Sequence, residues 1–419
     1  MRITPTALVK WIPLVLLLAA CGGAEQSSSE QSTDGRTGEP SGNGTSGGST
    51  TSGGVGGSGG SSGTTGTGGG GGATPPISPP GPGAGGSTVG AGGTSGGGAG
   101  TGSGGSGGSG GSTGGSGGGP AGQPGLLTAG AWDDNRNFDR FLRYRGGLAE
   151  QRVPGLLPIP DADHASARDQ ASAPLAPHDR LDISFVIDTT GSMGDELRYL
   201  QTEFLAISRT IAERYPNAEP RWSLVLYRDL RDEYVVRAFD FDGDPQAFQM
   251  RLAAQRAGGG GDMPEAPERG LGEMVALGWR AEPSVAKIAF WVADAPHHAV
   301  NAQALGSTIL QSRATGIHIY PVASSGVDEF TELTMRTAAQ LTGGRYLFLT
   351  DDSGVGNSHK EPSIPCYFVT RLDNAMLRMI DIELSGVYHE PAPSEIIRTG
   401  GNPQNGACAL ASGESAIVF

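Results

Sequence analysis

The chain lacks any cluster of basic residues and any apolar run long enough to span a membrane. Its 419 residues include 29 Lys and Arg against 43 Asp and Glu, which gives a formal net charge of −14 at pH 7. Nucleic acid is therefore not an expected partner, because binding to phosphates requires clustered basic side chains. The apolar run at residues 11–18 is too short for a transmembrane helix, which needs about 20 residues.

Residues 40–125 contain no Asp, Glu, Lys or Arg and almost no large apolar side chain. Such a segment cannot bury enough surface to offset the entropy lost on ordering, so we expect it to be disordered. It holds most of the chain's 72 glycines. These occur in runs without the strict three-residue period of collagen, which excludes a triple helix.

Several catalytic and nucleotide-binding motifs are also absent. The sequence has no Gly-x-x-x-x-Gly-Lys-Ser/Thr loop, and the glycine run at residues 258–261 follows a predicted helix rather than a strand. Residues 126–419 contain no Gly-x-Ser-x-Gly motif, and no Cys and His pair stands out as nucleophile and base. We therefore expect neither nucleotide binding nor enzymatic activity.

The first 21 residues have the features of a secretory signal. Arg2 and Lys10 precede the apolar run, and small residues follow it up to Cys21. The segment 18–21 resembles the lipobox of bacterial lipoproteins, which implies cleavage before Cys21 and lipidation of that residue. The resemblance also implies an outer-membrane destination, because Gly22 rather than Asp follows the cysteine. The alternative is an ordinary secretory signal that ends in an incidental cysteine.

From residue 181 the sequence alternates strand-like and helix-like segments. The predicted strands cover residues 181–188, 221–227, 234–239, 286–293, 317–322 and 345–349, and the predicted helices cover 193–215, 245–257, 264–277, 302–315 and 328–341. This order predicts an α/β fold with a Rossmann-like open, mostly parallel sheet and helices on both faces. Ligands of such sheets bind outside the carboxyl ends of the strands, where Asp188 and Asp294 stand.

The turn after the first of these strands carries oxygen side chains at every second position, Asp188, Thr190 and Ser192. Carboxylate and hydroxyl oxygens are ligands of hard divalent cations. The Asp-x-Ser/Thr-x-Ser pattern after a buried strand resembles the metal-ion-dependent adhesion site of von Willebrand factor type A domains, and residues 181–350 follow the element order of that fold. The resemblance implies that Thr190 and Ser192 ligate the metal, that Asp188 binds directly or through water, and that Asp294 is the second acidic position.

A third loop departs from that pattern, because Asp262 stands where most of the family has Thr. It follows the glycine run and resembles a subset of the family with a Gly-Gly-Asp-x-Pro-Glu loop. Asp188, Asp262 and Asp294 would together place three negative charges against a divalent cation, which reduces the demand for an acidic residue from a partner. One Mg²⁺ or Ca²⁺ is the expected ion.

Other interpretations of these residues stay open at this point. Ser192 and Asp262 are also suited to capping the helices that follow them. His297 and His298 lie beside Asp294, but adjacent histidines on a turn cannot easily face one ion. We interpret them as residues at the rim of the site rather than zinc ligands.

Cys366 and Cys408 are the two cysteines left after Cys21. In a compartment that permits oxidation, a disulfide between them would close a loop of about 40 residues and stabilise the fold by roughly 3–4 kcal/mol. Two buried free thiols are the alternative.

These observations divide the chain into five segments. They are a lipoprotein signal peptide (1–20), a disordered Gly/Ser-rich tether (21–125), a short N-terminal extension and connector (126–180), a von Willebrand factor type A domain (181–350), and a C-terminal helix and appendage (351–419).

The tether would have a root-mean-square span of roughly 50–60 Å. Within the extension, Trp132 and Phe138 are expected to pack on the main domain, with residues 152–180 as a loose connector. An apolar helix is expected at residues 368–384.

The resulting hypothesis is a lipid-anchored protein of the cell envelope that binds a protein or extracellular-matrix ligand through a divalent cation. The alternative is a structural or scaffold component of an envelope complex, whose metal only stabilises the loops. The loops that would select a ligand carry no motif that identifies it.

Overall fold

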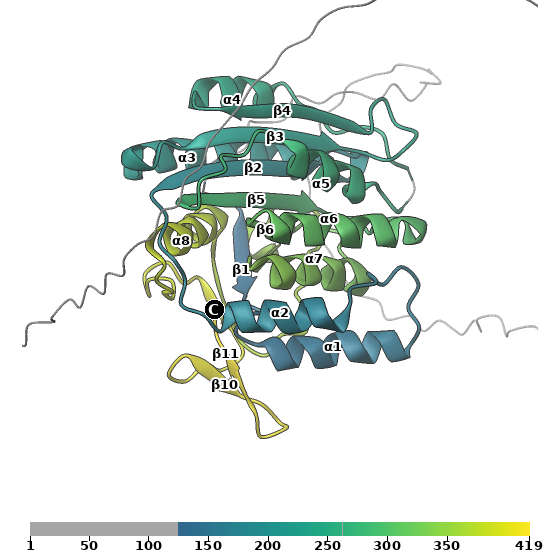
Figure 1. The fold of residues 1–419 in the computed structure, drawn as a ribbon, viewed down its shortest axis with the longest axis vertical. Coiled ribbons are helices and arrows are strands. Elements are labelled where there is room, and N and C mark those ends of the chain that lie inside the picture. The colour runs from purple at the N-terminus through teal and green to yellow at the C-terminus, as the bar shows by residue number, and fades with distance from the viewer. Residues whose placement is uncertain (1–124, 262) are drawn as a thin grey trace, which may run out of the picture. The chain divides into compact units, whose positions relative to one another are not determined.

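The computed structural model describes residues 125–261 and 263–419. The predictions for the signal peptide, Cys21, the tether up to residue 124 and Asp262 lie outside the described residues. The described part is organised by one mixed sheet of nine strands, in the order β4-β3-β2-β5-β6-β7-β1-β8-β9 (Figure 1). The strands are β1 (Thr128–Trp132), β2 (Arg180–Asp188), β3 (Arg221–Tyr227), β4 (Val236–Asp242), β5 (Val285–Ala293), β6 (Ile317–Ala323), β7 (Tyr346–Leu349), β8 (Tyr367–Arg371) and β9 (Arg398–Gly400).

The middle of the sheet is parallel, which confirms the predicted fold class. Strands β3, β2, β5, β6 and β7 run in one direction, and β4 pairs antiparallel with β3 at one edge. Every residue of β2 except Arg180, and every residue of β5 except Lys287, is buried. Such continuous burial is typical of strands that are covered by helices on both faces.

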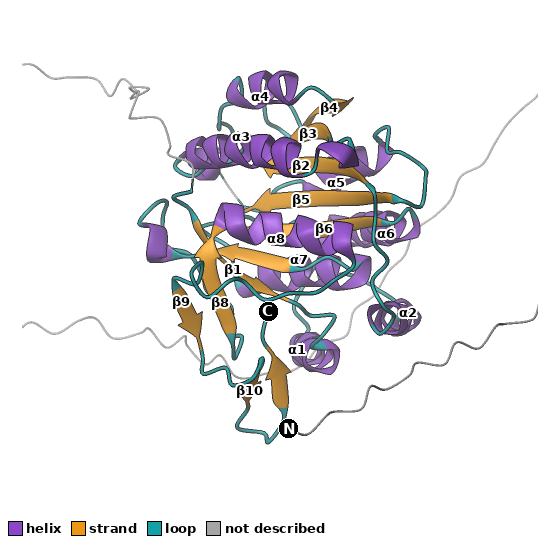
Figure 2. Cartoon of the chain, turned by 90° about the vertical axis from the view of Figure 1, so that its left-hand side faces the viewer, coloured by secondary structure: helices purple, strands orange, loops and turns teal. Residues whose placement is uncertain are grey.

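Helices cover both faces of the sheet (Figure 2). They are α1 (Phe138–Glu150), α2 (Asp161–Ala171), α3 (Leu197–Arg214), α4 (Pro245–Ala253), α5 (Pro267–Ala276), α6 (Ala302–Ala314), α7 (Glu329–Thr342) and α8 (Leu372–Ser385). Helices α3, α4 and α8 lie on one face, where Phe185 of β2 packs against Phe204 and Phe248. Helices α5, α6 and α7 lie on the other face with Val186. Successive side chains of β2 therefore point alternately into two hydrophobic cores, one on each face of the sheet.

Strand β1 belongs to the main sheet, although the sequence analysis did not predict a strand there. It lies between β7 and β8 and is antiparallel to both. Just before it, the backbone N–H groups of Gly125, Leu126 and Leu127 donate to the carboxylate of Glu203 on α3, at 2.8, 2.9 and 3.1 Å. Gly130 is opposite Phe348 of β7, whose ring occupies the space that a Cβ would need. The N-terminal extension is therefore an integral layer of the fold.

Two buried ion pairs hold the turn that follows β1. Asp134 accepts hydrogen bonds from Arg336 of α7 at 2.9 and 2.7 Å, and Asp133 accepts one from Arg345 at 3.2 Å. All four side chains are almost completely buried. Removing one member of such a pair leaves an uncompensated buried charge, so these pairs fix the extension in a single position. Trp132 and Phe138 are buried against the main domain, as expected.

Two segments differ from their expected structure. The connector at 152–180 is not wholly loose, because it contains α2, whose His164 and Ala167 are buried. The expected helix at 368–384 is divided into β8 and α8, and the chain passes from one to the other between Arg371 and Leu372. Tertiary pairing explains the division, since residues 369–371 form a ladder with β1 that a helix could not provide.

The C-terminal segment ends in a hairpin of β10 (Ala407–Ala409) and β11 (Ser415–Ile417). Cys366 and Cys408 are joined by a disulfide, with their Cα atoms 5.9 Å apart.

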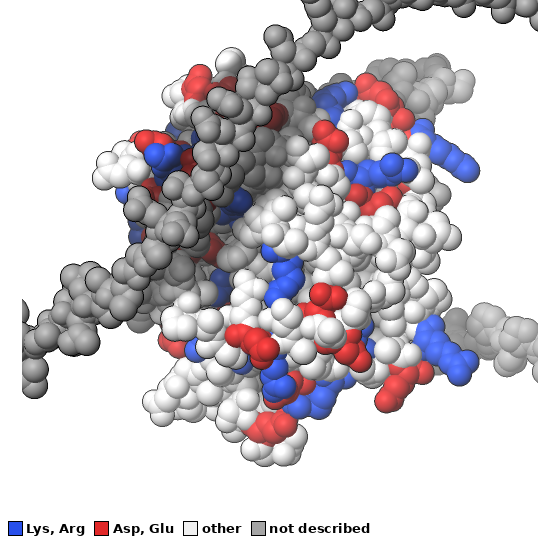
Figure 3. Space-filling model, viewed as in Figure 1, with Lys and Arg blue, Asp and Glu red and all other residues white. Residues whose placement is uncertain are grey.

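Within the described residues, no helix is long and apolar enough to cross a bilayer. Figure 3 shows acidic and basic side chains interspersed over one face of the molecule.

Candidate metal centre

Parallel pairing of β2 with β5 places two acidic residues next to each other. Ile187 of β2 is opposite Val292 of β5, and the ladder brings Asp188 and Asp294 to the same edge of the sheet. Both carboxylates are buried, with 0% and 1% of their residue surface exposed. The sequence predicted this juxtaposition, because parallel strands that are neighbours must end on the same side.

The turn after β2 adds two hydroxyl groups. Asp188 Oδ1 accepts hydrogen bonds from the backbone N–H of Thr190 at 2.9 Å and from its hydroxyl at 2.7 Å. The Thr190 Oγ1 and Ser192 Oγ atoms lie 3.2 Å apart. The 3-10 turn at Gly191–Gly194 directs Ser192 toward the edge, where it also bonds to Asp294. Ser192 lies inside this turn, whose N-cap position is Thr190, and the N-cap position of α3 is Glu196, so Ser192 occupies neither cap position.

Two carboxylate oxygens at this edge are left without partners. Asp188 Oδ2 and Asp294 Oδ1 are buried, and neither has a hydrogen-bond partner within residues 125–261 and 263–419. Buried polar atoms are almost always satisfied, so unpaired acceptors require an explanation. A cation bound between them would supply it, with the two hydroxyls as further oxygen ligands.

Burial and mutual repulsion disfavour charge on these carboxylates when no cation balances them. Loss of hydration raises the pKa of Asp188, and the nearby Asp294 raises it further. Burial likewise raises the pKa of Asp294, although the hydrogen bond from Ser192 opposes that shift. A divalent ion would lower both pKa values, because it stabilises the charged form of both carboxylates.

The glycine run is wrapped closely around the turn. The N–H of Gly258 donates to the Thr189 carbonyl at 3.0 Å, and the N–H of Gly191 donates to the Gly259 carbonyl at 3.2 Å. Gly259, Gly260 and Gly261 have φ values of +78°, +68° and +119°, a region that strains other residues. The loop thereby follows the Asp188 turn up to residue 261, while Asp262 itself lies outside the described residues.

Glu265 is a site residue that the sequence analysis did not identify. It is 2% exposed, its Oε2 has no hydrogen-bond partner in the described part of the chain, and its backbone pairs with His297. Burial raises the pKa of Glu265 to about 9, with further contributions from Asp188 and Asp229. The signal was present in the loop sequence, because Glu265 is the glutamate of the Gly-Gly-Asp-x-Pro-Glu segment.

A second group that the sequence analysis missed connects the C-terminal segment to this edge. Glu196, which is fully buried, accepts a hydrogen bond from the N–H of Ser325 at 3.0 Å and lies 2.9 Å from His359 Nε2. The Nδ1 atom of the same histidine lies 2.8 Å from a carboxylate oxygen of Asp351. No local motif could have indicated this contact, because Glu196 and His359 are separated by 163 residues.

The two adjacent histidines have separate partners, and His297 is buried with 2% of its surface exposed rather than placed at the rim. His297 Nε2 donates to the Gly155 carbonyl at 2.9 Å, and His298 Nε2 lies 2.6 Å from Asp229 Oδ1. Within the described ranges, no three His, Cys, Asp or Glu side chains converge as a metal-ligand group. The described oxygen donors are Asp188, Asp294, Thr190 and Ser192, a set that suits a hard cation and not zinc.

Comparisons with known proteins identify the fold of this region. Residues 182–351 match the family model of the von Willebrand factor A domain. A putative ariadne-like RING finger protein of Acanthamoeba polyphaga mimivirus is 30% identical over 127 residues, which cover 29% of this chain and 12% of that protein. The pilus adhesin SpaC of Lactobacillus rhamnosus GG in its open conformation aligns at 14% identity and a TM-score of 0.30, over 40% of this chain and 27% of SpaC. The chain thus spans a small part of each relative.

The His359 contact predicts a pH dependence of stability. Burial alone would lower the pKa of His359, but its hydrogen bonds to Glu196 and Asp351 outweigh burial and raise it. A raised histidine pKa contributes stability that is complete below the unfolded value of about 6.5 and is lost as pH rises through the folded value. Between pH 6 and pH 9, the free energy of unfolding measured with denaturant in EDTA is therefore expected to fall more in the wild type than in His359→Gln.

A matched control is His389→Gln, since His389 forms no ion pair with any described residue. This variant is expected to retain the wild-type pH dependence. Equal pH dependence in the wild type and His359→Gln would contradict the assignment.

Proposed function

We propose that the von Willebrand factor A domain recognised at residues 182–351 binds one divalent cation, Mg²⁺ or Ca²⁺, and uses this site to capture a protein or extracellular-matrix ligand. The observation that carries the proposal is the pair of buried carboxylate oxygens without partners, Asp188 Oδ2 and Asp294 Oδ1. Thr190 and Ser192 would complete the described part of the ligand set, and Asp262 is a further proposed ligand. When bound, the cation would supply an open coordination position to a ligand oxygen.

The number of carboxylates favours a particular kind of ligand group. Asp188, Asp294 and Asp262 would together carry more negative charge than a divalent ion can neutralise. Negative charges that surround the ion oppose the approach of an acidic side chain. We therefore propose that the ligand presents a neutral oxygen, such as a hydroxyl or a carbonyl.

Apolar side chains on the surrounding loops support a protein as the ligand. Leu230 follows β3, Met263 belongs to the loop before α5, and Val300 follows β5, so all three lie beyond the carboxyl edge of the sheet. Their exposed fractions are 44%, 55% and 90%. Exposed apolar side chains near a polar centre are typical of protein interaction surfaces.

A scaffold role is the second candidate, and the tight bonding of the loops favours it. Besides the contacts between the glycine run and the turn, the N–H of Gly260 donates to both carboxylate oxygens of Asp232 at 3.0 and 2.9 Å. Arg228 donates to the carbonyls of Thr189 and Arg256 at 3.1 and 2.8 Å. Loops held in this way could use a cation only for stability. Neither role includes catalysis, and we propose that the protein is not an enzyme.

We further propose that the chain is anchored in the cell envelope, in the outer membrane, by lipidation of Cys21. The support is the sequence of residues 1–22, in which a short apolar run ends in small residues and a cysteine. Residues 21–125 would then hold the domain at a distance from the membrane.

Metal binding can be measured by calorimetric titration of the metal-free chain with MgCl2 and CaCl2. Saturable binding of one ion is expected, with a Kd of about 0.1–1 mM. Asp188→Ala is expected to weaken binding at least about tenfold, because it removes an unpaired carboxylate oxygen. Asp169→Ala, on the exposed surface of α2, is the control and is expected to leave binding unchanged. No heat with either ion would refute the metal site.

Ligand capture separates the adhesion role from the scaffold role. The purified chain is immobilised and exposed to an envelope extract of the cells that produce it and, separately, to extracellular-matrix proteins, in Mg²⁺ or in EDTA. The adhesion role predicts a bound protein that is lost both in EDTA and with Asp188→Ala, and retained with Asp169→Ala. Metal binding without metal-dependent capture would instead favour the scaffold role.

The anchor is tested by Cys21→Ser. The wild-type chain is expected in the membrane fraction of the producing cells, with a lipid mass on Cys21, and the variant is expected to lose both. A wild-type chain that is secreted without a lipid would contradict the anchor and support an ordinary secretory signal.

A further inference from the structure

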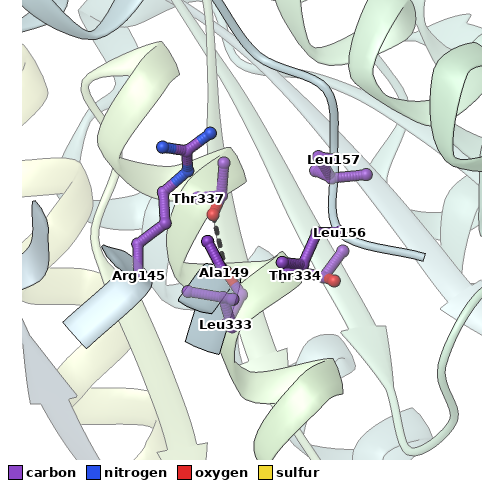
Figure 4. A pocket seen from close by; sticks show the side chains of 7 residues that line it. All are labelled: Arg145, Ala149, Leu156, Leu157, Leu333, Thr334 and Thr337. Carbon is purple, nitrogen blue, oxygen red and sulfur yellow. Dashed lines mark hydrogen bonds between the residues drawn. The ribbon is translucent and has the colours of Figure 1, made fainter. Parts of the chain in front are cut away.

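A cavity of about 240 Å³ lies at the amino ends of the parallel strands, the edge of the sheet away from Asp188. Its walls include His318 near the start of β6, Arg345 just before β7, and residues of α2, α6 and α7. A second hollow between α1 and α7 measures only about 20 Å³ and could hold about one water molecule (Figure 4). The hydroxyl of Thr337 there already donates to the Leu333 carbonyl at 2.7 Å. The larger cavity is the one with room for a ligand.

Arginine residues outnumber acidic residues in the wall of the larger cavity. Arg136, Arg313 and Arg345 line it together with one acidic residue, Asp133. Asp133 is already engaged, because it accepts a hydrogen bond from Arg345 at 3.2 Å and others from backbone N–H groups at 2.9 and 3.1 Å. Arg345 is thus neutralised within the protein.

Neither Arg136 nor Arg313 has a carboxylate of the described chain within salt-bridge distance. Arg313 donates to the Leu341 carbonyl at 2.6 Å and to the Ser166 hydroxyl at 3.0 Å, and the Arg136 guanidinium stacks over the Tyr388 ring at 3.8 Å. These contacts hold two guanidinium groups at the cavity wall, and Asp163 attracts Arg313 without forming a salt bridge with it. Guanidinium groups bind carboxylates and phosphates especially well, because their donors match the planar acceptor geometry.

A buried amide adds an unused donor. Gln340 of α7 lines the cavity and is fully buried. Its Oε1 accepts a hydrogen bond from His164 Nδ1 at 3.2 Å, while its Nε2 has no partner among the described residues. An unsatisfied buried N–H costs free energy that a ligand acceptor would recover.

The remaining wall is partly polar, through Asn135, Gln170 and His318, and partly apolar. Ala167 and Ala171 of α2, Leu175 beyond it and the ring of Tyr388 line the same cavity. A free inorganic anion would leave these groups in contact with water or empty space. The volume is below the range of roughly 300–1,000 Å³ that is usual for drug-sized ligands, so the occupant is small.

We propose that this cavity binds a small organic carboxylate with a compact apolar body, about the size of benzoate. The carboxylate would lie between Arg136, Arg313 and the Nε2 atom of Gln340, with the apolar body against Ala167, Ala171 and Leu175. This site is separate from the metal centre and does not depend on its function.

The proposal is tested by calorimetric titration of the full chain in EDTA with sodium benzoate, benzamide and inorganic phosphate. Saturable benzoate binding is expected, with benzamide at least about tenfold weaker because it has the same shape without the charge. Phosphate is also expected to bind more weakly, because it lacks the apolar body.

Substitutions locate the binding site. Arg136→Gln and Arg313→Gln are each expected to weaken benzoate binding at least about tenfold, whereas Arg209→Gln on the exposed side of α3 is expected to have no effect. Arg136 is exposed and contacts Tyr388 by stacking and a side-chain hydrogen bond. Arg136→Gln is therefore expected to fold even if Arg313→Gln, which loses two hydrogen bonds, disturbs the structure. Three outcomes would overturn the proposal: no saturable benzoate binding up to about 10 mM, equal binding of benzamide, or full binding by Arg136→Gln.

Discussion

The parallel alignment of β2 with β5 is the constraint on which the candidate metal centre depends. It brings Asp188 and Asp294 together at the edge of a buried sheet, where water cannot solvate both charges. Two carboxylates in such a place repel each other, and two of their oxygen atoms have no hydrogen-bond partner in the described residues. The arrangement is therefore costly without a positive charge. This cost is the physical basis for proposing a cation at the site.

The segments on either side of residues 182–351 complete the sheet. Strand β1 enters between β7 and β8, and its approach is fixed by the Glu203 carboxylate on α3. The following turn is fixed by Asp133 and Asp134 through Arg345 and Arg336. Because these contacts are buried, they tie the extension to residues 182–351. It also forms part of the wall of the 240 Å³ cavity at the edge away from the metal centre.

The sequence predicts the structure correctly where a residue pattern is compatible with one secondary structure. The apolar runs at 181–188 and 286–293 are strands because they are continuous and short, and the acidic residues after them had to share an edge once the strands were parallel. The sequence did not indicate the strands at 128–132 and 367–371, because these short segments are strands only through pairing: β1 pairs with β7 and β8, and β8 also pairs with β9. Glu265 was also not predicted, because its role depends on the burial of its carboxyl group near Asp188, which only the fold produces.

The sequence by itself determined the fold class, the oxygen-rich motif of Asp188, Thr190 and Ser192, and the pairing partner available to Cys366. These are properties of local order and of residue chemistry. Only the tertiary structure decided that Glu196 meets His359, that β1 completes the sheet, and that Arg136 and Arg313 face one cavity without a carboxylate partner. Those contacts join residues more than 100 positions apart, and packing brings them together without leaving any periodic signal in the chain.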